Sequence, residues 1–160
     1  MIDIRFRGVQ DKSPNSQLSN LANHQFNFDD IRCASVEGVL QSLKFKEQEA
    51  QHFVCSLYGF DAKRAGTYAD PWQSIQTLWW KGVPFHRSSD EYQSLLDKIY
   101  ESLYTQNETA KNILLATYPV KLTHTIGHTK ISETILTKKE FCSRLMRIRK
   151  ELYTSNILEF

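Results

Sequence analysis

The chain has 160 residues, of which 41% are hydrophobic and 24% are charged, and its formal net charge is +2 at pH 7. This length and composition fit one globular domain with a substantial hydrophobic core. The small net charge argues against a nonspecific nucleic-acid coat protein, although it permits a local basic patch.

Cysteine usage and hydropathy indicate the setting in which the protein works. The three cysteines, Cys33, Cys55 and Cys142, lie far apart and form no CxxC pair, so we expect neither a disulfide framework nor a zinc site. The first seven residues alternate apolar and polar side chains, and no apolar run approaches the ~20 residues that span a bilayer. We therefore expect a reduced cytoplasmic protein without a metal, a cofactor or a membrane partner.

The N-terminal elements follow from alternation and from loop-forming residues. Residues 2–7 alternate like a strand with one buried face, and the polar residues 8–20 predict a loop. Residues 25–32 predict a short hairpin. Ser35 then predicts a helix start, because its hydroxyl can accept a first-turn backbone N–H.

Helical spacing continues through the middle of the chain. The apolar residues of 50–57 predict an amphipathic helix that Gly59 could close. Residues 62–65 predict a short helical turn that stops at Gly66. Asp70-Pro71 is a favourable helix start, which predicts a helix to about Trp80.

Caps also delimit the C-terminal elements. Capping boxes at 88–91 and 137–140 and an Asn cap at Asn107 predict three further helices, and the alternating residues 120–126 predict a strand. Repeats, low-complexity segments and linkers are absent from the sequence. We expect an α+β fold, mainly helical, in a single domain over residues 1–160.

The predicted Ser35 helix carries an unusual polar stripe. Glu37, Gln41 and Lys44 are four and seven residues apart, so a carboxylate, an amide and an amine share one face. The rest of the helix is apolar and predicts core contacts, made by Val36, Val39, Leu40 and Leu43. The polar stripe must face either solvent or a pocket, and this choice separates a structural helix from an enzyme site.

Several motifs, in this order, resemble the NADAR (YbiA-like) family over residues 15–153. They are Leu18-Ser19-Asn20, Ser35-Val36-Glu37 with Gln41 and Lys44, Ala62-Lys63 with Gly66, Leu114-Leu115-Ala116-Thr117, and Leu145-Met146-Arg147-Ile148-Arg149. Arg87-Ser88, His124-Thr125-Ile126-Gly127 and Thr134-Ile135-Leu136-Thr137 resemble one branch of that family.

The resemblance implies an N-glycosidase that needs no metal. One branch removes ADP-ribose from guanine bases of DNA or RNA and so reverses a toxin modification. Another branch hydrolyses early riboflavin-pathway N-glycosides. The preferred expectation is ADP-ribosylated DNA as substrate, in an antitoxin or a phage counter-defence setting. A module that binds ADP-ribose or modified nucleic acid without catalysis is the alternative from another class. Sequence does not give the oligomeric state.

Glu37 and Lys44 are the expected catalytic residues. Glu37 would stabilise positive charge at the ribose C1″ or move a proton, although an acidic residue in a first helical turn also stabilises the helix dipole. Lys44 would act as an amine nucleophile on a ring-opened ribose or as an electrostatic partner of the diphosphate. An ordinary solvated lysine is the plain alternative.

The expected substrate-binding residues each have a structural alternative. Ser19 and Asn20 would bind ribose or diphosphate, or would only form a turn. Lys63 and Arg87 would hold the diphosphate, or would be solvated charges. The remaining candidates, from the same helix stripe or from elsewhere in the chain, are Gln41, Trp80 as a stacking partner for a base, His124, Gly127 and Thr134.

Two further groups have simple explanations. Cys142 is expected to be a small buried residue, with a Cys-His nucleophile pair as the alternative. The basic residues Arg144, Arg147, Arg149 and Lys150 are expected to form a solvated helix face, with a nucleic-acid contact as the alternative.

Overall fold

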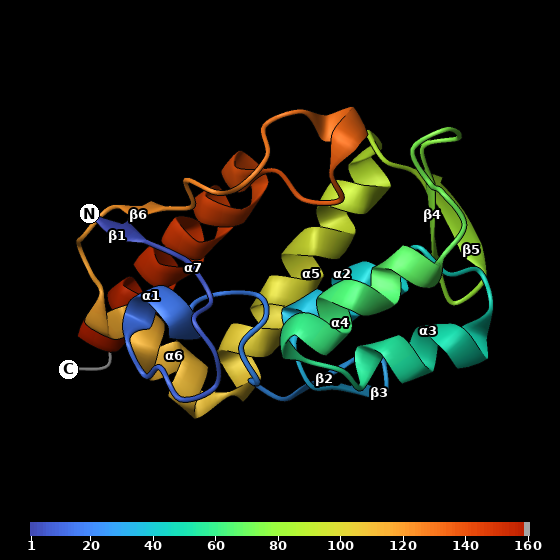
Figure 1. The fold of residues 1–160 in the computed structure, drawn as a ribbon. Helices are drawn as coiled ribbons and strands as arrows, with labels where there is room; N and C mark the ends of the chain where they lie inside the picture. The colour runs from blue at the N-terminus through green and yellow to red at the C-terminus, as the bar shows by residue number, and fades with distance from the viewer. Residues whose placement is uncertain (159–160) are drawn as a thin grey trace.

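The computed structural model describes residues 1–158, and its elements are mainly helical (Figure 1). The helices are α1 (Pro14–Gln17), α2 (Val36–Ser42), α3 (Gln48–Cys55), α4 (Gly59–Ala65), α5 (Asp90–Gln106), α6 (Glu108–Ala116) and α7 (Lys138–Leu158). The strands are β1 (Ile2–Asp3), β2 (Phe26–Phe28), β3 (Ile31–Cys33), β4 (Thr77–Trp80), β5 (Val83–His86) and β6 (Leu122–Thr123). Two 3₁₀ turns, η1 (Gly66–Tyr68) and η2 (Ile131–Glu133), complete the described elements. The expected α+β, mainly helical class is confirmed.

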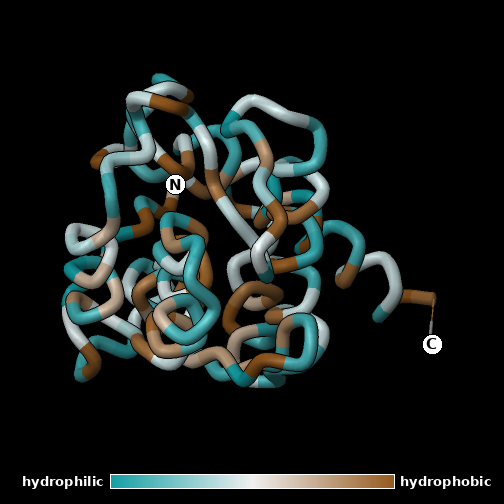
Figure 2. The backbone as a smooth tube through the Cα atoms, turned by 90° about the vertical axis from the view of Figure 1, so that its right-hand side faces the viewer, coloured by the Kyte–Doolittle hydropathy of each residue, from teal (hydrophilic) through white to brown (hydrophobic). Residues whose placement is uncertain are grey.

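The strands pair in small units rather than in one sheet. β1 lies parallel to β6, whereas β2–β3 and β4–β5 are antiparallel hairpins. Figure 2 shows hydrophobic segments alternating with hydrophilic ones along the chain, and the end of α7 projecting from the rest of the molecule. The core contains residues of both helices and strands, the latter including Phe26, Phe28, Leu78 and Leu122.

The predicted caps at Ser35, Asn107 and Thr137 are confirmed, whereas α5 is capped by Ser89 and not by the predicted capping box at 88–91. Ser35 Oγ accepts from the Gly38 N–H at 2.9 Å and donates to Leu57 O at 2.8 Å. Ser89 and Asn107 cap α5 and α6 in the same way. The Thr137–Glu140 capping box is reciprocal, since each backbone N–H donates to the other side chain. These local signals fix where α2, α5, α6 and α7 begin.

The predicted helix from Pro71 to Trp80 is wrong. β4 and β5 form a hairpin whose two turn residues, Lys81 and Gly82, have φ values of +50° and +81°. A two-residue turn with positive φ values has a backbone twist that matches the twist of the two strands it joins. The β-branched and aromatic residues of β4 also favour a strand. The Asp70-Pro71 signal starts only a short turn.

Smaller differences occur around the remaining elements. The predicted strand 2–7 is only β1, and the predicted loop 8–20 contains α1. α3 ends at Cys55, and Gly59 begins α4 with φ +63° instead of closing the helix before it. The predicted strand 120–126 shortens to β6, because pairing with β1 covers only two residue pairs.

α2 is buried along its whole length, from Val36 to Ser42. Its apolar residues lie in the core as predicted, and it packs against α3, α4 and α5 (Figure 1). A Cβ at Gly38 would lie 2.7 Å from Leu57 O and 2.8 Å from Val54 O. Gly38 therefore lets α2 approach the C-terminal end of α3, and the polar stripe of α2 does not face open solvent.

Candidate functional site

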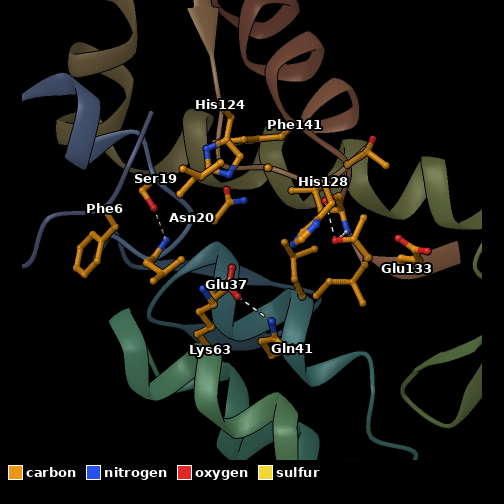
Figure 3. A pocket seen from close by; sticks show the side chains of 18 of the residues that line it. Phe6, Ser19, Asn20, Glu37, Gln41, Lys63, His124, His128, Glu133 and Phe141 are labelled. Carbon is orange, nitrogen blue, oxygen red and sulfur yellow. Dashed lines mark hydrogen bonds between the residues drawn. The ribbon is translucent and has the colours of Figure 1, made fainter. Parts of the chain in front are cut away.

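A cavity of about 460 Å³ lies over the exposed end of the polar stripe (Figure 3). Its volume is typical of small-molecule and cofactor sites. Nine of the predicted site residues line it: Ser19, Asn20, Glu37, Gln41, Lys44, Lys63, His124, Gly127 and Thr134. They come from the loop before β2, from α2 and α4, and from the segment between β6 and α7. The fold thus gathers residues up to 115 positions apart into one wall.

Glu37 is the buried acid of this cavity. Only 9% of the residue is exposed, and Oε1 accepts from Gln41 Nε2 at 2.7 Å. Burial raises the pKa of Glu37, against the opposing effects of the Gln41 hydrogen bond and of positive charge on Lys44 and Lys63. A carboxyl group in this environment can carry a proton closer to neutral pH than an ordinary glutamate, as a general acid or base requires.

Lys44 follows the C-terminal end of α2 and faces the same cavity. Burial lowers the pKa of its ammonium group, and the charge of Glu37 opposes this change. The two side chains form no ion pair within 4.0 Å in residues 1–158, so each remains available to a ligand. Burial therefore moves the pKa values of Glu37 and Lys44 toward each other.

Gln41 connects this pair to α4. Its Oε1 is buried and has no hydrogen-bond partner in the described part of the chain. A Cβ at Gly66 would lie 1.8 Å from that oxygen and 3.1 Å from Lys44 Nζ. Gly66 has ordinary helical backbone angles (φ −62°, ψ −21°), which any residue can adopt. Glycine is needed here because a side chain would occupy the space of the Gln41 amide.

The Gly66→Ala substitution is expected to disturb the site without changing any functional group. The new methyl group must displace the Gln41 amide, and we expect kcat/KM to fall about 10–100-fold, as for other small misplacements of catalytic groups. Steady-state kinetics of Gly66→Ala, Gln41→Ala and the double variant form the test. If Gly66→Ala acts through Gln41, the double variant will be no worse than Gln41→Ala alone.

Ser19 and Asn20 hold the loop that faces Glu37. Ser19 Oγ accepts from the Leu21 N–H at 3.2 Å, which is a turn interaction. Asn20 O accepts from the Glu37 N–H at 2.9 Å, and Asn20 Oδ1 accepts from the Tyr100 hydroxyl at 2.9 Å. These bonds fix the loop against α2, and they leave the Asn20 amide N–H₂ group on the cavity wall (Figure 3).

His124 contributes an oriented imidazole to the cavity lining. Its Nδ1 lies 2.7 Å from Ile4 O, a carbonyl acceptor, so Nδ1 carries a proton and this bond fixes the orientation of the ring. The ring also packs edge-on against Phe141, with centroids 5.4 Å apart. A Cβ at Gly127 would lie 2.6 Å from His124 Cδ2, so Gly127 is explained by packing against this ring.

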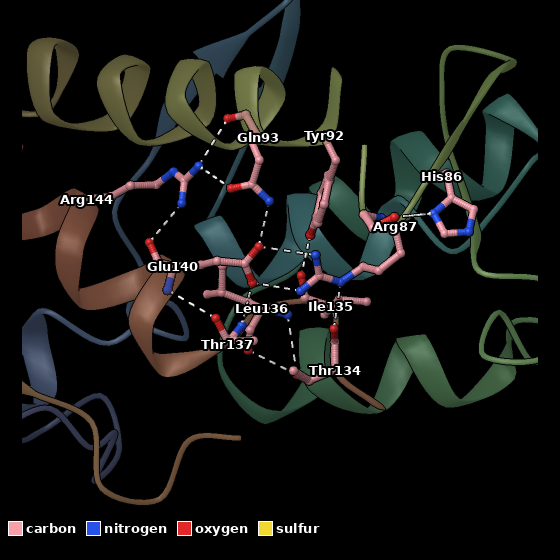
Figure 4. A network of polar contacts seen from close by, with 11 residues as sticks. His86, Arg87, Tyr92, Gln93, Thr134, Ile135, Leu136, Thr137, Glu140 and Arg144 are labelled. Carbon is pink, nitrogen blue, oxygen red and sulfur yellow. Dashed lines mark hydrogen bonds and ion pairs between the residues drawn. The ribbon is translucent and has the colours of Figure 1, made fainter. Parts of the chain in front are cut away.

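Arg87 is not a ligand contact, and that prediction is wrong. The residue is fully buried, and its guanidinium forms a bidentate pair with Glu140 at 2.7 Å and 3.1 Å (Figure 4). Arg87 Nε donates to Thr134 O at 2.8 Å. Although burial by itself raises the pKa of Glu140, hydrogen bonds from Arg87 and Gln93 outweigh it and lower the pKa to about 2. Arg87 therefore supports the cavity wall at Thr134 from behind.

Trp80 also lies outside the cavity. Its Nε1 donates to Asp29 Oδ2 at 2.8 Å, and its ring packs against Phe28 with centroids 5.2 Å apart. Trp80 belongs to the hairpin strand β4 and not to the predicted helix, so its side chain does not reach the cavity. Trp72, by contrast, is 3% exposed and lines the cavity.

The other residue groups are structural in different ways. Cys142 is buried, and burial raises the pKa of its thiol to about 11, which disfavours a thiolate nucleophile. The basic residues of α7 do not form a uniformly solvated helix face. Arg144 is buried against Asp97 and Gln93, and Arg149 is buried against backbone carbonyls near Thr117. These two arginines cannot form an open phosphate-binding face.

Some cavity residues were not predicted. They are Arg5, Phe6, Leu21, Leu40, Phe60, Trp72, Gln73, Ile126, His128, Glu133, Ile135, Leu136, Thr137 and Phe141. Their positions depend on how the segment after β1, the helix α4 and the segment between β6 and α7 meet around the cavity, which no local pattern encodes. Across residues 1–158, no cluster of three or more His, Cys, Asp or Glu side chains is placed to hold a metal ion. In the same residues, no helix is long and apolar enough to cross a membrane.

Comparison with known proteins identifies the family. Residues 12–150 match the family described as bacteriophage protein GP30.3, so the chain belongs to this NADAR-like family. It is 37% identical over 141 residues to an uncharacterized 17.1 kDa protein in the Gp30-rIII intergenic region of enterobacteria phage T4. That match covers 87% of this chain and 92% of the phage protein.

A solved structure has the same fold. The NMR structure of the E. coli protein YbiA superposes with a TM-score of 0.63 over 98% of this chain and 89% of YbiA. The two sequences are 21% identical, so the likeness concerns the fold. The expected NADAR/YbiA-like fold is confirmed.

Proposed function

We propose that this protein is an N-glycosidase that hydrolyses ADP-ribose from guanine bases of ADP-ribosylated DNA. The observation that carries the proposal is Glu37, a buried carboxyl group with a raised pKa on the wall of a cavity of about 460 Å³. Lys44, Lys63 and His124 lie on the same wall. The NADAR-like family membership supports this reaction class.

The reaction breaks the bond between the ribose C1″ and a guanine nitrogen. The electron pair of that bond leaves with guanine, which gains a proton, and a water molecule supplies the hydroxyl that bonds to C1″. Protonated Glu37 can donate the proton to guanine, or its carboxylate can stabilise the positive charge at C1″. The unpaired Gln41 Oε1 is available for a ligand N–H or O–H group.

Lys44 has two possible roles in this reaction. If the ribose ring opens, the neutral Lys44 amine can attack C1″, displace guanine and form a Schiff base, which water then hydrolyses to restore the amine. Alternatively, the ammonium form binds the diphosphate. Lys63, with Ser19 and Asn20, would hold the ribose and diphosphate in either case.

The Lys44→Arg variant separates these roles, because arginine keeps the charge and lacks a nucleophilic amine. If Lys44 is the nucleophile, we expect kcat to fall about 100-fold or more, as for other positioned catalytic groups. Borohydride during turnover should then leave an adduct on Lys44 of the wild type, detected by peptide mass spectrometry. Lys46→Arg, at an exposed position nearby, is the matched control. Full activity of Lys44→Arg and no adduct would establish the electrostatic role.

The phage relative supports a counter-defence setting, in which the protein restores DNA modified by a host toxin. An antitoxin role is the alternative setting, and the proposed substrate would make the activity cytoplasmic. ADP-ribosylated RNA and small riboflavin-pathway N-glycosides are the alternative substrates, and a noncatalytic ADP-ribose-binding module is the alternative class.

Relative kcat/KM values test the choice of substrate. The wild-type protein is incubated with ADP-ribosyl-guanine DNA, the matching RNA and a riboflavin-pathway N-glycoside, and released base or ADP-ribose is quantified. We expect the DNA substrate to give the highest kcat/KM. A higher value for the small N-glycoside would assign the metabolic reaction, and saturable binding without release from any substrate would assign the binding module.

A further inference from the structure

Two aromatic side chains meet at one end of the cavity. Phe6 and Phe60 both line it, and their rings meet edge to face with centroids 5.4 Å apart and an interplanar angle of 66°. Phe60 is 53% exposed, although it lies beside a cavity of ligand size. We infer that this end of the cavity binds a nucleobase ring by stacking on Phe60, an inference that rests on the proposed function.

The backbone around the aromatic pair presents it to the cavity. The Gly59 N–H donates to Leu21 O at 2.8 Å, which fixes the start of α4 against the loop that carries Ser19 and Asn20. A Cβ at Gly59 would lie 3.9 Å from the Phe6 ring. The start of α4 therefore packs directly beside Phe6, and Phe60 follows as a cavity-lining residue that is 53% exposed.

Positive charge accompanies the aromatic rings. Arg5 precedes Phe6, and Lys63 lies three residues after Phe60 on the same face of α4. Neither cation forms an ion pair with any residue in 1–158. Aromatic faces interleaved with cations are the usual means of binding nucleotides through their bases and phosphates.

The opposite end of the cavity has a different character. Glu133 lies there near His128, and Figure 3 shows it on the far side of Glu37 from Phe6. A carboxylate at that end disfavours a diphosphate, whereas Arg5 and Lys63 attract one. With C1″ held at Glu37, the diphosphate therefore extends toward Phe60, and the stacked ring is the adenine of the ADP-ribosyl group. The other source of a nucleobase is the nucleic-acid strand itself.

Calorimetric titration of the Phe60→Ala variant tests this assignment, with AMP, ADP-ribose, ribose 5-phosphate and an unmodified oligonucleotide as probes. Loss of one stacking contact weakens binding by about 10–100-fold. We expect that loss for AMP and ADP-ribose, unchanged affinity for ribose 5-phosphate, and recovery in Phe60→Trp. Phe53→Ala, which removes a phenylalanine of α3 that is 65% exposed, is the control for an unrelated surface change.

Three results would overturn the assignment. An equal loss of ribose 5-phosphate affinity would show that Phe60 does not act through a base. A loss confined to an unmodified oligonucleotide would move the stacked base to the nucleic-acid strand. Absence of AMP binding by the wild type would exclude an adenine site. Because these are equilibrium measurements, Phe60-dependent AMP binding without release of ADP-ribose from DNA would disprove the glycosidase and leave the stacking site standing.

Discussion

The Glu37→Gln substitution is expected to lower kcat on ADP-ribosyl-guanine DNA by about 10²–10⁴-fold, the usual contribution of a positioned acid or base. Glutamine keeps the shape of the side chain and the hydrogen bond from Gln41, but it can neither carry the proton nor stabilise a cation. Single-turnover release of ADP-ribose measures the change. Glu108→Gln is a matched control, because Glu108 is also in the first turn of a helix and is exposed.

The same substitution should stabilise the fold at neutral pH. A raised pKa means that the folded state prefers neutral Glu37, so its favourable contribution is complete below the ordinary value of 4.5 and is lost as pH rises through the raised value. Thermal melts should therefore show a higher Tm for Glu37→Gln at pH 8, and the gain should disappear below pH 4.5. An active, unstabilised variant would mean that Glu37 serves only the helix dipole.

The Glu140→Gln substitution is expected to cost about 3–5 kcal/mol of folding free energy, the usual effect of removing one partner from a buried ion pair. It leaves the fully buried Arg87 without its bidentate partner, whereas glutamine can still complete the capping box with Thr137. Urea denaturation followed by circular dichroism measures the loss. Asp61→Asn, which breaks an exposed pair with Arg64, should cost about 1 kcal/mol or less.

The effect of Glu140 should depend on pH. A pKa lowered to about 2 means that the stabilisation is complete above the ordinary value of 4.5 and is lost as pH falls toward 2. The wild type and Glu140→Gln should therefore converge in stability at low pH. If Glu140→Gln matched Asp61→Asn at neutral pH, the Arg87 pair would not support the cavity wall as described.

Local chemistry explains why much of α2 and its site could be predicted. Ser35 caps the helix through contacts within one turn, and the 3.6-residue period puts Glu37 and Gln41 on one face whatever surrounds them. Sequence left open whether that face meets water or a pocket. Packing of α3, α4 and the segment from His124 to Phe141 decides it, and the family resemblance pointed to the correct alternative.

Long-range partners explain the errors. An arginine followed by two serines gives no sign that a carboxylate 53 residues later will bury it, so Arg87 was assigned to the ligand. Trp80 followed a favourable helix start, but the positive φ values of Lys81 and Gly82 place it in a hairpin. Phe60 was not predicted as a site residue, because sequence does not show that a cavity lies beside this exposed aromatic side chain.

The most direct test of the central claim is the mass of both products after the wild-type protein acts on DNA with a single ADP-ribosyl-guanine. We expect intact DNA with its guanine restored, together with one equivalent of free ADP-ribose. An abasic site or AMP would show that a different bond is broken, and unchanged substrate under saturating protein would contradict a glycosidase centred on Glu37.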